Sequence, residues 1–161
     1  MLAHRLAGLY AITPDWSDTR RLLGVTEAIL EAGCRILQYR NKVASDCHRQ
    51  EQAVALRGLT RRFDALFLVN DDIDLACYCE ADGVHLGEND AELRVARHHL
   101  GPDKILGASC YQDIQQGIRA AQADADYIAF GSFFPSMTKP QARRAPLDLL
   151  TQNRQMAGRP V

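Results

Sequence analysis

Apolar residues along the chain follow two alternating patterns. Short runs of about five apolar residues predict buried strands, and between them apolar residues recur every three or four positions, as on one face of a helix. The predicted strands are Gly8–Thr13, Arg35–Arg40, Leu66–Asn70, Gly83–Gly87, Ile105–Ser109 and Tyr127–Gly131. The predicted helices are Thr19–Ala32, which Gly33 would end, Ser45–Arg62, Asp72–Glu80, Ala91–Leu100, Asp113–Ala123 and Pro146–Met156, which Pro146 would start.

Strands that alternate with helices predict an α/β fold with parallel strands and right-handed crossovers. Two architectures fit this order: an open doubly wound sheet, or a (β/α)8 barrel. A complete barrel needs roughly 200 residues or more, and the chain has 161. Pro160-Val161 has the composition of the first residues of a seventh strand. We expect a single domain over residues 1–161, and, if it is a barrel, one whose C-terminal part is missing.

Composition and charge restrict the class of protein. Hydrophobic residues make up 47% of the chain and charged residues 24%, as in a soluble globular protein. The net charge of −1 gives no reason to expect nucleic acid or an anionic membrane as a partner. We find neither a signal peptide nor an apolar run long enough to span a bilayer, and so expect a cytoplasmic protein. The five scattered cysteines predict reduced thiols; a zinc site at Cys77 and Cys79 would need further ligands.

Polar residues gather where the predicted strands end. In Q-Y-R-N-K, strand geometry places Gln38, Arg40 and Lys42 on one face, where apolar residues are usual. The other strand ends carry Asn70 and Asp71, Asp90, Ser109, and finally Ser136, Thr138 and Lys139. The carboxyl ends of all strands surround one site in a barrel, whereas in an open sheet only those near the switch point meet. Five consecutive strands that end in such groups therefore favour the barrel.

The charges of these residues indicate the chemistry. Arg40, Lys42 and Lys139 only donate hydrogen bonds, and together they can bind several oxygens of a polyanion. Asp71 and Asp90 would repel each other unless a cation lay between them, and Mg²⁺ bound to carboxylates and phosphate oxygens removes this conflict. Cationic side chains together with Mg²⁺ suit a diphosphate leaving group. The hydroxyls of the last loop could hold a second, smaller phosphate.

Structural roles remain open for several of these residues. Arg40 and Lys42 could form ion pairs with Asp71 and Asp90, and Asp90 could cap the helix that follows it. His85 lies in the middle of a predicted strand, where a hydrogen-bonded core histidine is the favoured interpretation over a catalytic base.

Five segments together resemble the thiamine-phosphate synthase family. They are Q-Y-R-N-K, V-N-D-D-I-D-L-A, A-D-G-V-H-L-G-E-N-D, L-G-A-S-C and D-Y-I-A-F-G-S-F-F-P-S-M-T-K-P, and the resemblance runs from Leu6 onward. It implies a TIM barrel and an enzyme that joins hydroxymethylpyrimidine diphosphate to a thiazole phosphate and releases diphosphate. CO₂ is also released when the thiazole arrives as its carboxylate.

The resemblance also implies roles for individual residues. Pyrimidine diphosphate would be bound by Gln38, Arg40, Lys42, Asn70, Ser109 and Lys139; the thiazole phosphate by Ser136 and Thr138; and Mg²⁺ by Asp71 and Asp90. Arg40, Lys42 and Lys139 would be catalytic, because they stabilise charge on the departing diphosphate.

The chain departs from the family pattern most clearly at its end. The glycine-rich segment after strand seven and the loop after strand eight do not follow Val161. We therefore also consider a thiazole tautomerase of the same fold, and an inactive substrate-binding fragment. Retention of the diphosphate-binding residues argues against the tautomerase. Exposed edges of the first and sixth strands would favour a homo-oligomer.

Overall fold

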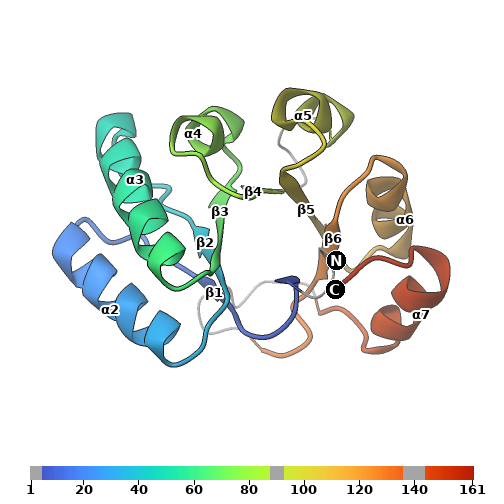
Figure 1. Cartoon of the computed structure of the whole chain (residues 1–161). Coiled ribbons are helices and arrows are strands. Elements are labelled where there is room, and N and C mark those ends of the chain that lie inside the picture. Colours follow the sequence, from blue (N-terminus) through green and yellow to red (C-terminus); the bar gives the residue numbers. More distant parts are fainter. Residues whose placement is uncertain (1–4, 88–92, 136–143) are drawn as a thin grey trace. The chain divides into compact units, whose positions relative to one another are not determined.

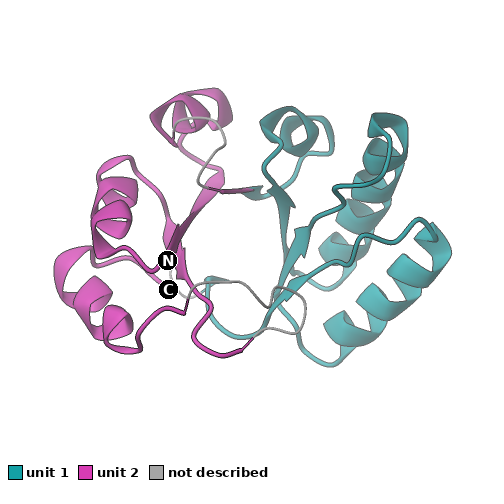
Figure 2. Cartoon of the chain, turned by 180° about the vertical axis from the view of Figure 1, so that it is seen from behind, with its two compact units in different colours: residues 1–84 teal, residues 85–161 magenta. Residues whose placement is uncertain are grey.

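The computed structural model describes residues 5–87, 93–135 and 144–161. Strands alternate with helices along the chain, as the sequence predicts (Figure 1). The chain divides into two compact units, residues 1–84 and 85–161 (Figure 2), with the division inside β4 (Gly83–Leu86). The α/β fold with parallel strands is confirmed in each unit.

The first unit contains three paired strands. Its elements are β1 (Tyr10–Ile12), α2 (Thr19–Glu31), β2 (Ile36–Tyr39), α3 (Asp46–Arg62), β3 (Leu66–Asn70) and α4 (Ile73–Tyr78). β1 pairs with β2, and β2 with β3, in parallel and in chain order. Every side chain of β2 is buried, including that of Gln38, and so are the first four of β3, which form a continuous apolar run. Leu30, Leu59 and Ala65 form a small core beneath the helices.

The end of α2 illustrates how local sequence sets an element boundary. Gly33 has a φ of +99°, in the left-handed region that favours glycine. Its N–H donates to Leu30 O, and the N–H of Cys34 donates to Ile29 O. These two bonds form a Schellman motif, so the prediction that Gly33 ends the helix is confirmed.

The second unit continues the alternation. Its elements are α5 (Leu93–Leu100), β5 (Ile105–Tyr111), α6 (Ile114–Gln122), β6 (Tyr127–Phe130) and α7 (Asp148–Met156). β5 and β6 are parallel neighbours, with a register shift between Ser109 and Tyr111. The core lies between these strands and α6 and α7, and includes Ile128 and Leu149.

The prediction that Pro146 begins the last helix is wrong by two residues. Leu149 N–H donates to Pro146 O and Leu150 N–H to Leu147 O, so a tighter turn of 3₁₀ type precedes α7. Pro160-Val161 is not assigned to a strand. Ile128 N–H of β6 nevertheless donates to Pro160 O (2.9 Å), so the edge of β6 is not unpaired at this position, contrary to expectation.

An Ala-Asp pair precedes a strand in each unit and ties it to its neighbours. Asp82 accepts from Arg57 of α3 through both carboxylate oxygens and from Phe67 N–H of β3. In the second unit, Asp126 accepts through Oδ2 from both Arg97 Nη2 of α5 and Leu106 N–H of β5. Both aspartates lie at the amino ends of the strands, away from the predicted site residues. Their role is to hold a helix and two strands in place.

Candidate active site

The alternation in Q-Y-R-N-K places its side chains in two different environments. Gln38 is buried, and its Nε2 donates to Tyr10 OH on the neighbouring strand (2.7 Å). Tyr39 is buried as well, but its OH donates to Gln52 Oε1 of α3 (2.9 Å). Burial raises the pKa of Tyr39 to about 12, so the hydroxyl remains a donor at neutral pH. Gln38 and Tyr39 thus contact different elements, as expected for neighbours in a strand; β2 ends at Tyr39, so Arg40 and Lys42 lie beyond it.

A buried glutamine supports the segment from behind. Gln52 is fully buried; its Oε1 also accepts from Asn41 Nδ2 (3.1 Å), and its Nε2 donates to Trp16 O (3.0 Å). Asn41 Oδ1 in turn accepts from Val43 N–H and Ala44 N–H. The sequence analysis did not identify Gln52, although a polar residue on the buried face of a helix was a usable signal.

The two cations of the segment have carboxylate partners. Arg40 Nη1 lies 2.9 Å from Asp15 Oδ2, and Lys42 Nζ lies 2.9 Å from Asp71 Oδ2. The prediction that Lys42 could pair with Asp71 is therefore correct, whereas Arg40 pairs with Asp15, which the sequence analysis did not name. The Lys42 side chain is 56% exposed and that of Asp71 22% exposed. This contact joins the segments that follow β2 and β3.

The segment that carries Asp71 has an unusual backbone. Asn70 ends β3, and Asp71 has a φ of +63°, in the left-handed region where Asp and Asn are enriched. Asp72 then caps α4, because its Oδ1 accepts from Leu75 N–H (2.8 Å). Asn70 thus ends the strand, Asp71 forms the ion pair with Lys42, and Asp72 caps the helix that follows.

Ser109 belongs to a hydrogen-bonded chain in the second unit. His85 Nε2 lies 2.8 Å from Ser109 Oγ, and His85 Nδ1 lies 2.8 Å from Tyr127 OH. His85 and Tyr127 are buried and their rings are stacked. The interpretation of His85 as a hydrogen-bonded core histidine is therefore confirmed. Its Nε2 is in hydrogen-bond contact with Ser109, a predicted substrate-binding residue.

We expect Tyr127→Phe to lower the free energy of unfolding by about 1–3 kcal/mol, because the change removes a hydroxyl from a buried hydrogen bond. Urea denaturation followed by circular dichroism would measure this difference. Tyr111→Phe is a matched control, since Tyr111 ends the adjacent strand and is 45% exposed. Equal effects of the two substitutions would contradict the proposed importance of the Tyr127–His85 bond.

Comparison with known proteins identifies the family. The model of the family described as thiamine monophosphate synthase matches residues 9–161. Thiamine-phosphate synthase of Methylobacillus flagellatus is 50% identical over 156 residues, which cover 97% of this chain and 74% of the relative. The enzyme of Alcanivorax borkumensis is 48% identical over 162 residues, covering 100% and 75%.

The chain belongs to the thiamine monophosphate synthase family. Like its relatives it is a transferase of thiamine biosynthesis. A solved structure agrees: thiamine phosphate pyrophosphorylase from Pyrococcus furiosus superposes with a TM-score of 0.80 at 37% sequence identity, covering 94% of this chain and 71% of that one.

Four of the predicted site residues of this family member lie outside the described residues. They are Asp90, Ser136, Thr138 and Lys139. The described residues place Gln38, Arg40, Lys42, Asn70 and Asp71 in the first unit and Ser109 in the second. Among the described residues, no group of three or more metal-ligating His, Cys, Asp or Glu side chains occurs.

The five cysteines of this family member all lie within the described residues, form no disulfides and differ in exposure. All five are free thiols, as predicted; Cys34, Cys79 and Cys110 are buried, whereas Cys47 and Cys77 are exposed. Cys110 follows the predicted site residue Ser109. Burial raises the pKa of the Cys110 thiol to about 12, so it is not a thiolate nucleophile at neutral pH.

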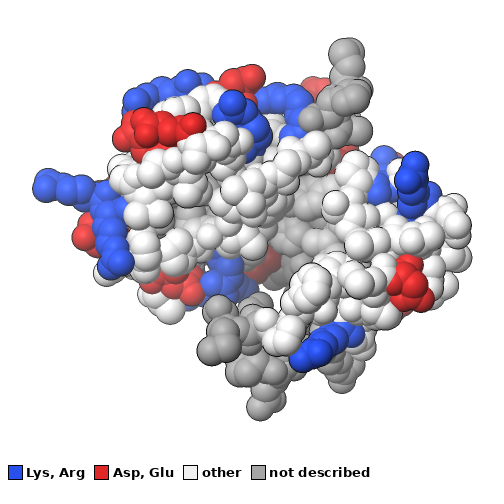
Figure 3. All heavy atoms as spheres, turned by 90° about the horizontal axis from the view of Figure 1, so that it is seen from below, with Lys and Arg blue, Asp and Glu red and all other residues white. Residues whose placement is uncertain are grey.

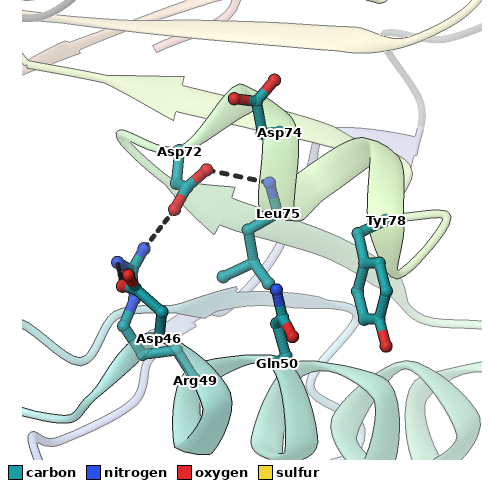
Figure 4. Close-up of a pocket in the computed structure, with 7 residues that line it drawn as sticks. All are labelled: Asp46, Arg49, Gln50, Asp72, Asp74, Leu75 and Tyr78. Atoms are coloured by element: carbon teal, nitrogen blue, oxygen red, sulfur yellow. Dashed lines mark hydrogen bonds and ion pairs between the residues drawn. The ribbon is translucent and has the colours of Figure 1, made fainter.

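A pocket of about 390 Å³ also lies between α3 and α4 of this family member (Figure 4). Its lining residues are Asp46, Arg49, Gln50, Asp72, Asp74, Leu75 and Tyr78. None of the predicted site residues lines it. Arg49 joins α3 to the cap of α4 through its ion pair with Asp72, and it also pairs with Asp46 within α3. The pocket is therefore separate from the diphosphate-binding residues that the sequence predicts.

Charged side chains of both signs lie on the surface of this family member (Figure 3). Basic and acidic side chains are interspersed on the face drawn in Figure 3, in keeping with the net charge of −1. Within the described part of the chain, no helix is both long enough and apolar enough to cross a bilayer.

Proposed function

We propose that the chain condenses hydroxymethylpyrimidine diphosphate with a thiazole phosphate to give thiamine phosphate and diphosphate. Carbon dioxide is also lost if the thiazole carries a carboxylate. The observation that carries the proposal is the contact between Lys42 Nζ and Asp71 Oδ2, with Arg40 on the same segment as Lys42. A diphosphate leaving group needs positive charge at its oxygens, which Arg40, Lys42 and an Mg²⁺ ion held by Asp71 would supply, whereas a tautomerase acting on the thiazole alone has no such need. Sequence identities of about 50% to thiamine-phosphate synthases support the same assignment.

The proposed reaction is dissociative. The bond between the pyrimidine methylene carbon and the diphosphate oxygen breaks, and its electron pair leaves with the diphosphate. The thiazole nitrogen then donates its lone pair to the resulting pyrimidine-methyl cation. Arg40, Lys42 and Lys139 stabilise the charge that develops on the departing diphosphate. Electrostatic stabilisation and positioning account for catalysis, and a covalent enzyme intermediate is not required.

The remaining predicted residues bind and orient the substrates. Gln38 and Asn70 would contact the pyrimidine diphosphate, Ser109 the pyrimidine, and Ser136 and Thr138 the thiazole phosphate. Gln38 is preordered by its bond to Tyr10 OH, and Ser109 by its bond to His85. Preordered polar groups lose less conformational freedom when the substrate binds.

Mg²⁺ would be held by Asp71 and Asp90. The Asp71 carboxylate fits such an ion in its chemistry, because it offers hard oxygen ligands at the end of a strand and is partly exposed. Asp90 lies outside the described residues. When bound, the ion supplies positive charge to the diphosphate oxygens.

We further propose that the strands belong to a TIM barrel. The chain order of β1, β2 and β3 in one unit, and of β5 and β6 in the other, supports this, as does the TM-score of 0.80 to the Pyrococcus furiosus pyrophosphorylase. A cytoplasmic location and a homo-oligomeric state stay predictions.

The proposal is tested by incubating the protein with both substrates and Mg²⁺. We expect thiamine phosphate and diphosphate to form in equal amounts, and to depend on Mg²⁺; chromatography with a fluorescent thiamine derivative and a diphosphate assay would measure them. Isothermal titration with the pyrimidine diphosphate separates the alternatives. Mg²⁺-dependent binding without coupling would indicate a substrate-binding fragment. Isomerisation of a carboxythiazole phosphate without pyrimidine binding would indicate a tautomerase.

A further inference from the structure

The segment after β1 lies along the predicted diphosphate-binding segment after β2. Thr13 N–H donates to Gln38 O (2.9 Å), which continues the pairing of the two strands. Arg40 N–H donates to Thr13 Oγ1 (2.8 Å), and this hydroxyl donates to Arg40 O (3.0 Å). The backbone of Arg40 is therefore held on both its N–H and its C=O. Pairing between the two segments extends beyond the ends of the strands.

Asp15 adds a second set of bonds to the same segment. Its carboxylate accepts from Arg40 Nη1 through both oxygens, at 3.1 Å and 2.9 Å. Its Oδ1 also accepts from the backbone N–H of Lys42 (2.9 Å). One carboxylate thus fixes the side chain of the first cation and the backbone of the second.

The geometry leaves much of the Arg40 guanidinium available. Only Nη1 contacts Asp15, and among the described residues Nε and Nη2 have no hydrogen-bond partner. Arginine has five N–H donors in a planar arrangement, so a phosphate can bind to the nitrogens that Asp15 does not use. The Arg40 side chain is 28% exposed, which keeps these donors within reach of a ligand.

Folding stability is a weak explanation for this arrangement. The Asp15 side chain is 34% exposed, and ion pairs this exposed contribute little to stability. By contrast, a long side chain that is ordered before the ligand arrives loses less conformational entropy on binding. The bonds of Asp15 therefore favour a role in binding.

We propose that Asp15 is a positioning residue that orders Arg40 and Lys42 for the diphosphate group of the pyrimidine substrate. This inference rests on the proposed function. Asp15 does not touch the substrate; it acts through the two cations. A carboxylate beside Arg40 also weakens the attraction of an anion, so neutralisation by Asp15 would lower the affinity for diphosphate instead of raising it. The sign of the change in affinity distinguishes ordering from neutralisation.

Three variants test the inference. Asp15→Ala removes all three bonds, whereas Asp15→Asn keeps an oxygen that can accept from Lys42 N–H and Arg40. Glu27→Gln is the matched control, since Glu27 forms an exposed ion pair with Arg62 at 2.9 Å between α2 and α3. Isothermal titration with pyrimidine diphosphate and Mg²⁺ gives the affinity, and steady-state kinetics give KM for the thiazole phosphate.

We expect Asp15→Ala to weaken the affinity for pyrimidine diphosphate about tenfold, because binding must then order a side chain that Asp15 holds in place in the wild type. KM for the thiazole phosphate and the thermal midpoint should stay within the range of Glu27→Gln. Asp15→Asn should recover part of the affinity. Unchanged or tighter binding in Asp15→Ala, or a KM for the thiazole phosphate that rises equally, would overturn the inference.

Amide exchange measured by nuclear magnetic resonance separates this inference from the proposed function. The Lys42 N–H should exchange about tenfold faster in Asp15→Ala than in the wild type or Glu27→Gln, with no substrate present. Equal exchange rates would refute the ordering role whatever the enzyme does. A different outcome would refute the proposed function: amide exchange responds as expected, but the wild type binds no pyrimidine diphosphate. In that case the segment is ordered by Asp15, but the ligand assigned to it is wrong.

Discussion

Asp71→Asn should lower kcat for coupling by about 10²- to 10³-fold, as is typical when a group that stabilises transition-state charge is removed. The amide keeps the size of the side chain but loses the charge that would hold Mg²⁺ and that pairs with Lys42 Nζ. Asparagine is preferable to alanine here, because Asp71 has a φ of +63° and asparagine tolerates that backbone. Initial rates at saturating substrates, over a series of Mg²⁺ concentrations, would measure the loss.

The neighbouring residue provides a matched control. Asp72 caps α4 and pairs with Arg49, and asparagine is also a good capping residue. Asp72→Asn should therefore leave turnover near that of the wild type. Lys139→Ala should lower the rate as strongly as Asp71→Asn. Near-normal turnover in Asp71→Asn, or equal losses in Asp71→Asn and Asp72→Asn, would remove the specific role assigned to Asp71.

The elements were predictable because strong local signals coincide with their ends. β3 begins and ends at the predicted residues, Leu66 and Asn70, since an apolar run is bounded there by polar residues. α3 begins at Asp46 rather than at the predicted Ser45, because Ser45 is the cap and its hydroxyl accepts from His48 N–H. α7 was misplaced because proline is compatible with a 3₁₀ turn as well as with the first turn of an α-helix.

The site was predictable only in part, because some of its contacts join residues that lie far apart in the sequence. The different environments of Gln38 and Tyr39 follow from strand geometry, which the sequence carries locally. The partner of Arg40 does not: Asp15 lies 25 residues away, and its position depends on the path of the chain after β1. Pattern reasoning finds the ends of strands, but it does not find which residue of a neighbouring loop reaches them.

The long-range partners of the aspartates at the amino ends of strands were also not predicted from the sequence. Asp82 and Asp126 were noticed in the sequence only within motifs of the family resemblance. Each accepts a backbone N–H from the preceding strand, and an arginine from the helix that comes before that strand, Arg57 of α3 for Asp82 and Arg97 of α5 for Asp126. If the strands belong to a TIM barrel, as we propose, catalytic groups are expected at their carboxyl ends and stabilising contacts at their amino ends. The two Ala-Asp pairs fit the second category, and their repetition at the start of two strands was the signal that could have revealed them.

Gly107→Ala should strongly destabilise the second unit. Gly107 lies opposite Tyr127 in the parallel pairing of β5 and β6, and the Tyr127 ring crosses the space where a Cβ would be. A methyl group there would overlap the ring carbons and the hydroxyl, so the ring must move. Because Tyr127 is buried and its hydroxyl contacts His85, that movement breaks the chain of bonds that orients Ser109.

We expect Gly107→Ala to lower the free energy of unfolding by about 3 kcal/mol, at the upper end of the usual cost of overpacking a core. Urea denaturation would measure it. Gly58→Ala is a control that should raise the free energy of unfolding instead of lowering it. Gly58 lies within α3, and a Cβ there meets nothing within 4 Å. That variant should gain about 0.5–1 kcal/mol, because alanine is the better helix former.

A double-mutant cycle identifies the cause of the loss. Tyr127→Ala removes the ring that a Cβ at Gly107 would strike, so Gly107→Ala should cost much less in that background than in the wild type. A coupling free energy of about 1–3 kcal/mol is expected for two groups in direct contact. If Gly107→Ala costs the same in both backgrounds, the overlap with Tyr127 is not its cause, and the loss must come from the β5 backbone itself.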